Sequence, residues 1–187
     1  MQLLGVEVHW ASKSTPFFQM VKLMAAIFRA RVRRAMVGRI PLIVVGSLRI
    51  GEVAALRWER IHPDRIDVVQ RFYEGEFDDT KTDAGRRSIP LDSFGILRNV
   101  LESAWQRSKH RNPGDLVFTN ARGGPINRRN LLRRQLKPTL NMLGLPATVD
   151  FRSFRTMHSS LMSSVGVRPE VTRDNMGHAT IDVTQNA

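Results

Sequence analysis

Four basic residues spread along the chain have the side-chain types needed to bind and activate a phosphate ester: Arg49, Lys81, Arg155 and His178. Phosphoryl transfer needs positive charge against the non-bridging oxygens and a proton for the leaving oxygen. Two arginines can supply the charge, and a lysine can supply the proton. No acidic cluster in the sequence has the spacing of metal ligands, so chemistry with two metal ions fits poorly. These residue types therefore suit phosphoryl transfer and fit poorly with a mechanism that uses two metal ions.

Arg49 lies in the most informative stretch, residues 46–58, at the predicted start of a short and otherwise apolar helix. Glu52 follows three residues later on the same helix face, where its carboxylate can orient the guanidinium. A guanidinium fork held rigidly at the edge of a core suits an anion such as phosphate. Taken alone, Arg49 is better interpreted as a salt-bridged arginine at a helix start, and Lys81 as an ordinary turn residue.

Arg155 lies in another apolar helix, where an unpaired buried charge would be costly. His158 follows three residues later, and we interpret it as a structural hydrogen-bond partner. His178 comes directly after Gly177, where a cation can also simply cap a helix end. A functional role for Arg155 or His178 therefore depends on whether the other motifs of the chain support it.

The composition favours a nucleic-acid partner. The 187 residues include 29 Lys and Arg against 17 Asp and Glu, which gives a net charge of +12. A strongly basic globular chain most often binds nucleic acid. We expect one basic helix face in particular to contact the DNA backbone; its residues are Arg128, Arg129, Arg133 and Arg134. No cysteine is present, which excludes disulfides and thiolate metal sites and suits a reducing cytoplasm.

The beginning of the chain is unusually basic. Residues 8–51 contain no Asp or Glu while seven Lys and Arg accumulate up to Arg39. A targeting segment has this composition, but a DNA-facing helix followed by core sequence is the favoured interpretation. No apolar run reaches the length of a transmembrane helix.

The hydrophobic pattern predicts an α+β fold, mainly α-helical with one small antiparallel sheet that carries Lys81 near a turn. In one helix, an apolar stripe is formed by Phe94, Leu97, Leu101 and Trp105. An extended run is expected at 115–119, and strands at 65–72 and 87–90. Helices are expected at 17–37, after Asp92, and at 127–137, 151–165 and 170–176. Residues 41–56 are expected to hold either one helix or two broken ones around Gly46 and Gly51.

Five motifs in order resemble the tyrosine recombinase (phage integrase) family. The order and spacing match from about Pro41 onward, and although each motif is weak alone, five together are a strong signal. They are the first arginine motif at 46–58, the hairpin lysine segment at 80–82 with 86–91, the segment at 117–119 with 124–126, the second arginine motif at 154–161 with 166–167, and the Gly-His box at 176–180.

The resemblance implies a mainly helical catalytic core with a small sheet that breaks and rejoins duplex DNA without a cofactor. A tyrosine would attack a DNA phosphate and leave a free 5′ hydroxyl. Arg49 and Arg155 would clamp the phosphate, and Lys81 would protonate the leaving oxygen. His178 would assist proton transfer, and Glu52 would support Arg49. In the family, subunits assemble as tetramers on DNA, and a cytoplasmic, nucleoid-associated location is implied.

Two departures from the family pattern stand out. Arg152 occupies the position where the family usually has histidine, and an arginine cannot act as a general base at neutral pH. The nucleophilic tyrosine is expected nine or ten residues after His178, but position 187 is Ala187. The only tyrosine, Tyr73, is interpreted as a packing residue.

We therefore expect residues 41–187 to form an integrase-type catalytic domain lacking its C-terminal end and its nucleophile. Residues 1–40 would form an atypical basic helical segment. The alternative is a non-catalytic DNA-binding integrase remnant or regulator. A basic RNA-binding protein is a third possibility, which would leave the order of the motifs as coincidence.

Overall fold

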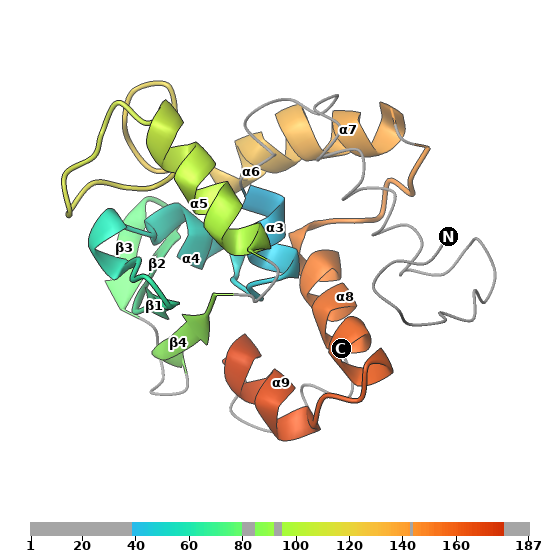
Figure 1. The fold of residues 1–187 in the computed structure, drawn as a ribbon. Helices are drawn as coiled ribbons and strands as arrows, with labels where there is room; N and C mark the ends of the chain where they lie inside the picture. The colour runs from blue at the N-terminus through green and yellow to red at the C-terminus, as the bar shows by residue number, and fades with distance from the viewer. Residues whose placement is uncertain (1–38, 80–84, 92–94, 143, 178–187) are drawn as a thin grey trace.

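The computed structural model describes residues 39–79, 85–91, 95–142 and 144–177, which form a mostly helical body with two small antiparallel sheets (Figure 1). The expected helix at 17–37 lies outside these residues. Lys81, Phe94 and His178 also lie outside them. No helix in the described segments is long and apolar enough to cross a bilayer.

Two short helices, α3 (Arg39–Val44) and α4 (Ile50–Ala55), flank the turn that begins the first arginine motif. At Gly46, a Cβ atom would lie 2.8 Å from the Leu42 carbonyl oxygen, so the chain can turn tightly only without a side chain. Ser47 follows in the left-handed region with φ of 56°. The predicted break at Gly46 is confirmed, whereas the one at Gly51 is wrong because Gly51 lies inside α4.

The strands form two two-stranded sheets rather than the single sheet expected. β1 (Arg65–Val68) pairs with β4 (Arg87–Pro90), and β2 (Gln70–Tyr73) pairs with β3 (Glu76–Asp79), both antiparallel. The expected strand at 65–72 is thus divided at Val69. β3 is not predicted from the sequence, because its acidic residues are mostly exposed and the strand shows no hydrophobic alternation.

The helix α5 (Ile96–Arg107) packs beside α3 and confirms the expected helix after Asp92. Leu97 and Leu101 of the predicted stripe are buried. Trp105 remains 39% exposed, with its ring edge-on to Trp58 in the 3-10 turn η1 (Trp58–Arg60), at a centroid distance of 4.8 Å. The predicted run at 115–119 forms only single bridges, Arg57 to Leu116 and Thr119 to Pro125.

The predicted helix at 127–137 changes its winding partway. Asn127 caps α6 (Arg128–Leu131), whose chain continues as the π-helical turn η3 (Leu132–Leu136) and then as α7 (Lys137–Met142). Leu131 and Leu136 are buried as expected, and Leu132 is half-buried. The helix therefore begins where predicted and runs about one turn further.

The last two helices confirm the predicted elements at 151–165 and 170–176 to within a residue. Asp150 caps α8 (Phe151–Ser164) by accepting hydrogen bonds from two backbone N–H groups, and α9 (Pro169–Met176) ends at Gly177 in the left-handed conformation. Phe154 of α8 is fully buried beside α3, so α8 and α3 share one hydrophobic core. That core fixes Arg155 relative to the turn at Ser47.

Candidate active site

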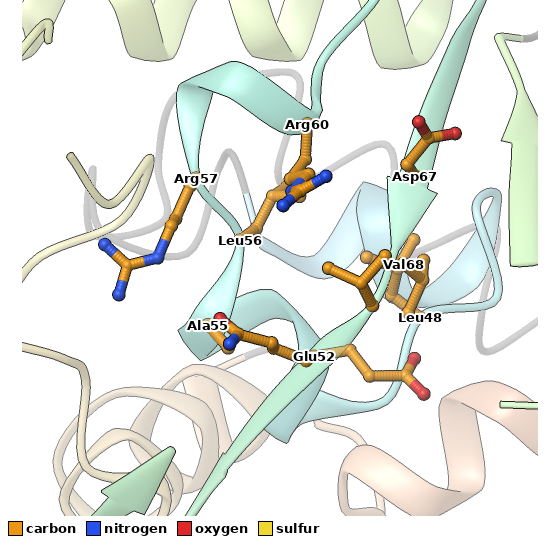
Figure 2. A pocket seen from close by; sticks show the side chains of 10 residues that line it. Leu48, Glu52, Ala55, Leu56, Arg57, Arg60, Asp67 and Val68 are labelled. Atoms are coloured by element: carbon orange, nitrogen blue, oxygen red, sulfur yellow. The ribbon is translucent and has the colours of Figure 1, made fainter. Parts of the chain in front are cut away.

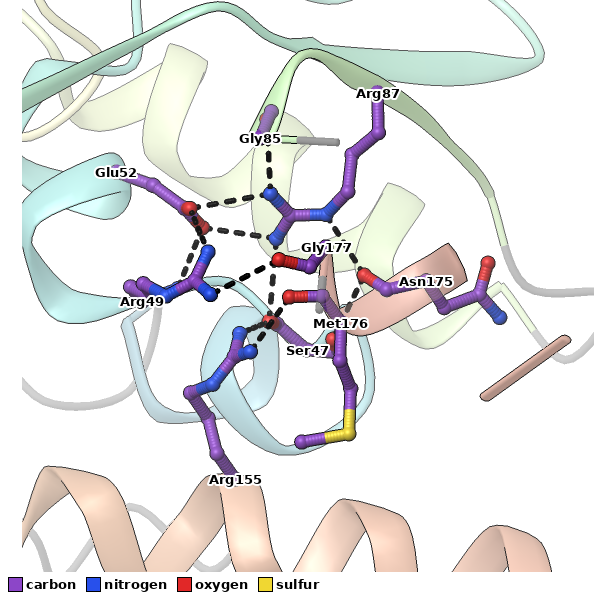
Figure 3. Close-up of polar contacts among 9 residues, drawn as sticks. All are labelled: Ser47, Arg49, Glu52, Gly85, Arg87, Arg155, Asn175, Met176 and Gly177. Carbon is purple, nitrogen blue, oxygen red and sulfur yellow. Dashed lines mark hydrogen bonds and ion pairs between the residues drawn. The ribbon is translucent and has the colours of Figure 1, made fainter. Parts of the chain in front are cut away.

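The turn at Ser47 is the meeting point of arginines from distant segments (Figure 3). The Ser47 carbonyl oxygen accepts a hydrogen bond from Nη1 of Arg155 and another from Nη2 of Arg87, at 3.4 Å for Arg87. The hydroxyl of Ser47 donates to the Asn175 carbonyl at 2.9 Å. The left-handed φ of Ser47 therefore belongs to a turn that two guanidinium groups and α9 hold in place.

Arg49, Arg87 and Arg155 form an arginine cluster beside Glu52. Among the described residues, Glu52 is the single carboxylate in this cluster, and its side chain is only 2% exposed. Arg49 approaches it with its backbone N–H at 2.7 Å and with Nη1 at 2.9 Å. Arg87 donates to both carboxylate oxygens, at 3.1 and 2.9 Å. Burial acts to raise the pKa of Glu52, but the hydrogen bonds and charge of Arg87, and then those of Arg49, hold it below the usual value.

Arg87 of β4 uses all five of its N–H groups on protein acceptors. Besides Glu52 and Ser47, it donates to the Asn175 carbonyl at 2.8 Å and to the Gly85 carbonyl at 3.2 Å. Its side chain is 7% exposed. A guanidinium with every donor satisfied has none left for a substrate, so Arg87 positions Glu52 and α9.

Sequence reasoning included Arg87 in a motif but assigned it no role. One signal could have found it: Arg87 and Ile89 occupy alternate positions in β4, and Ile89 is buried. Side chains at alternate positions of a strand point to the same face. The alternation therefore directs Arg87 inward.

The C-terminal end of α9 supplies acceptors to all three arginines. The carbonyl of Asn175 accepts from Arg87, that of Met176 from Nη2 of Arg155 at 2.6 Å, and that of Gly177 from Nη2 of Arg49 at 3.1 Å. The last carbonyls of a helix lack partners within the helix and carry partial negative charge. They are thus suited to gathering guanidinium groups.

Arg155 is 9% exposed and lies among positive charges. Burial and, to a lesser extent, the charges of Arg49 and Arg87 lower its pKa to about 9, against the opposing effect of Glu52. It still carries its charge at neutral pH. Three guanidinium groups therefore face one carboxylate, and the cluster has an excess of positive charge.

Arg49 is the most accessible guanidinium of this cluster. Its side chain is 43% exposed, against 7% for Arg87. Among the described residues, Glu52 and Gly177 accept from only two of its side-chain N–H groups. The remaining donors suit an anion that arrives from solvent.

The hydrocarbon side of Glu52 lines a small pocket between α4 and β1, together with Leu48 and Val68. Figure 2 shows the Glu52 carboxylate pointing away from Arg57, another basic residue of this pocket. The cavity volume of about 10 Å³ is enough for one water molecule and not for a substrate.

The structure brings Arg49, Glu52 and Arg155 together at the Ser47 turn and the end of α9. Arg152 is exposed on the first turn of α8, and the four arginines of α6 and η3 are also exposed. Lys81 and His178 lie outside the described residues. The interpretation of Tyr73 as a packing residue is wrong, since it is 51% exposed near the end of β2.

The structural role predicted for His158 agrees with its geometry. Its ring lies on α8 and is 2% exposed, and Nδ1 lies 2.8 Å from the Val44 carbonyl oxygen. Burial lowers the pKa of His158, and the charge of Arg155 lowers it further, against the hydrogen bond to Val44. A neutral ring with its proton on Nδ1 therefore joins α8 to the end of α3.

The described residues thus form a helical core with two small sheets and an arginine cluster braced by one carboxylate. The sequence profile of the Phage integrase family matches residues 13–186, and the chain belongs to this family of tyrosine recombinases. No curated protein matches it in sequence.

Solved structures of tyrosine recombinases have the same fold. The Tn1549 transposon integrase in complex with transposon right end DNA is 21% identical with a TM-score of 0.77, over 97% of this chain and 63% of that one. The XerA recombinase is 15% identical with a TM-score of 0.70, and the match covers 98% of this chain and 60% of that one. A lambda integrase dimer bound to a COC′ core site is 16% identical with a TM-score of 0.63, and the match covers 89% of this chain and 45% of that one. The chain thus spans less than two thirds of each. These matches confirm the predicted fold class.

Proposed function

We propose that this chain binds duplex DNA and holds one backbone phosphate at Arg49 and Arg155. The observation that carries the proposal is that Arg49 and Arg155 both donate to the last carbonyls of α9, those of Gly177 and Met176. Glu52, itself held by Arg87, braces Arg49 while part of its guanidinium stays open to solvent. Family membership supports a substrate of this class. Residues 41–187 would form the catalytic domain.

The chemistry proposed for this site is metal-free strand breakage and rejoining. A tyrosine oxygen would bond to the phosphorus while the bond to the 5′ oxygen breaks, and the leaving oxygen would take a proton from Lys81. Arg49 and Arg155 would neutralise the charge that develops on the non-bridging oxygens. His178 would assist proton transfer, and Arg152 would add positive charge beside the phosphate.

The exposed face of α6 and η3 would contribute affinity without sequence information. Lysines and arginines on phosphates position a duplex but do not read its bases. We assign this role to the residues expected to bind the backbone, all of which are exposed on this helix: Arg128, Arg129, Arg133 and Arg134.

Replacing Arg49 by methionine tests the phosphate site. Charge-assisted hydrogen bonds are worth about 1.5–3 kcal/mol, so Arg49→Met is expected to weaken duplex binding by roughly ten- to a hundredfold. The control is Arg60→Met, because Arg60 has a matching side-chain exposure of 44% and lies outside the cluster. Fluorescence anisotropy with a labelled duplex at a fixed salt concentration measures both variants.

Equal affinities of the two variants would contradict a phosphate site at Arg49. Competition with RNA of the same length separates DNA binding from the RNA-binding alternative, since a preference for RNA would favour the latter. The comparison is made at several salt concentrations, where loss of one phosphate contact reduces the slope by about 1.

The second candidate function is DNA binding without cleavage. It is favoured by the presence of a single tyrosine in residues 1–187, Tyr73 of β2. We expect this polypeptide to bind a nicked suicide duplex without forming a covalent adduct that survives denaturation. An adduct on a denaturing gel would refute this expectation, and its loss in Tyr73→Phe would then identify Tyr73 as the nucleophile.

A further inference from the structure

Arg39, the first residue of α3, is a buried cation outside the arginine cluster. It is 8% exposed, and its guanidinium lies over the Phe118 ring at 5.5 Å. Nη2 donates to the Thr119 carbonyl at 3.3 Å. Its Nε is buried and has no hydrogen-bond partner among the described residues.

A charge buried with so few partners is costly unless an anion offsets it. Within the described segments, neither an ion pair nor a neighbouring carboxylate accompanies Arg39, and burial alone lowers its pKa, to about 10. Arg87, by contrast, also has a nearly buried side chain, 7% exposed, but is fully paired with Glu52, Ser47, Gly85 and Asn175. Arg39 thus has the donors of a binding residue without a protein acceptor for most of them.

A cavity of about 340 Å³ opens beside Arg39, between the start of α3, the end of α5 and the loop at 117–123. Arg107, Lys109 and His110 also line it, and among the described residues of its lining there is no Asp or Glu. A cavity of this size is within the range of small-ligand sites. It shares no lining residue with the arginine cluster at Ser47.

Gly123 shapes one wall of this cavity. Its φ is 82°, and a Cβ atom there would lie 3.2 Å from Nε2 of His110. Glycine therefore lets the loop approach the imidazole closely. The close approach keeps a ring nitrogen at the wall beside three cationic side chains.

We propose that the cavity at Arg39 binds a phosphate group. Three cations without an opposing carboxylate suit a doubly charged oxyanion, and the guanidinium fork matches the spacing of phosphate oxygens. The phosphate can come from free inorganic phosphate or from the backbone of a bound duplex. The site is separate from the one proposed at Arg49.

The test is made in the Arg49→Met background, so that the other proposed phosphate site is absent and failure of one proposal does not count against the other. Inorganic phosphate is titrated calorimetrically into this protein and into its Arg39→Met derivative, in buffer free of other oxyanions. We expect Arg39→Met to weaken phosphate binding at least tenfold. The matched control is Arg98→Met, because Arg98 is an exposed arginine whose Nη2 also donates to one carbonyl, that of Pro63, at 2.9 Å.

A second arm measures duplex affinity of the same proteins by anisotropy. If Arg39→Met lowers duplex affinity tenfold and the Arg49→Met parent shows no detectable binding of inorganic phosphate, the source of the phosphate is DNA. Lys109→Met is the companion variant, since Lys109 is exposed and its loss leaves the core intact. Lys109→Met is expected to weaken binding of the same ligand about threefold. If Arg39→Met does not fold, this variant tests whether the cavity binds phosphate. Unchanged affinity for both ligands in the folded variants overturns the proposal.

Discussion

Replacing Arg87 with methionine is expected to lower the free energy of unfolding by about 3–5 kcal/mol, the usual result of removing one partner of a buried ion pair. Glu52 would keep only Arg49 as a charged partner, while the carbonyls of Ser47, Gly85 and Asn175 would each lose a donor. Urea denaturation followed by circular dichroism measures the change. Because Arg49 loses its braced carboxylate, duplex affinity should fall as well.

The adjacent Arg86 provides the matched control. It pairs with Asp79 at 2.6 Å, but the side chains are 54% and 63% exposed. Exposed pairs are worth about 0–1 kcal/mol, so Arg86→Met should leave stability nearly unchanged. The double variant Glu52→Gln with Arg87→Met should recover part of the loss, because it no longer buries a lone carboxylate. Similar losses for Arg86→Met and Arg87→Met would show that Arg87 does not organise the cluster.

Replacing Phe154 with alanine is the other change expected to have a large effect. Phe154 is fully buried, and its ring centroid lies 6.5 Å from that of Phe151. Truncating a buried phenylalanine typically costs about 3–5 kcal/mol, since the cavity is only partly refilled. Its neighbour Arg155 would lose its fixed position, so duplex binding should weaken even where the variant remains folded.

The comparison for this variant is Phe77→Ala on β3. Phe77 is 40% exposed, lies 4.9 Å from the Phe72 ring and contacts the Arg57 guanidinium. An aromatic pair of this kind is worth about 0.5–1.5 kcal/mol. In urea denaturation, the unfolding midpoint of Phe154→Ala should therefore be lower than that of Phe77→Ala, with the same dependence of stability on urea concentration in both. A Phe154→Ala loss no greater than that of Phe77→Ala would mean that α8 is not anchored by this core.

Local patterns in the sequence predicted the helices after Asp92 and at 127–137, 151–165 and 170–176, and also the pairing of Arg49 with Glu52. The three-residue spacing places Arg49 at the N-cap of α4 and Glu52 in its first turn. Glycine marks the turn at Gly46, where a side chain would clash, and the end of α9 at Gly177, where φ is positive. Asp150 is a cap that the same rules explain. Such features depend only on neighbouring residues.

Contacts between distant segments could not be predicted in the same way. The fivefold pairing of Arg87 joins β4 to α4 and α9, and no short window of sequence contains those acceptors. The π-helical turn at Leu132–Leu136 likewise has no signal in a periodicity that treats every helix as an α-helix. Division of the sheet at Val69 depends on which strands pair, and the alternating pattern alone does not determine that.

The acceptors supplied by the end of α9 also determine when the arginine cluster can form during folding. Arg49 reaches Gly177 across 128 residues of sequence, Arg155 reaches Ser47 across 108, and Arg87 reaches Asn175 across 88. Contacts of such long range form only after the intervening chain has closed its loops, which makes them slow and mutually dependent. The cluster should therefore be among the last parts to become ordered, and the phosphate binding proposed for it would report that the chain between these segments has folded.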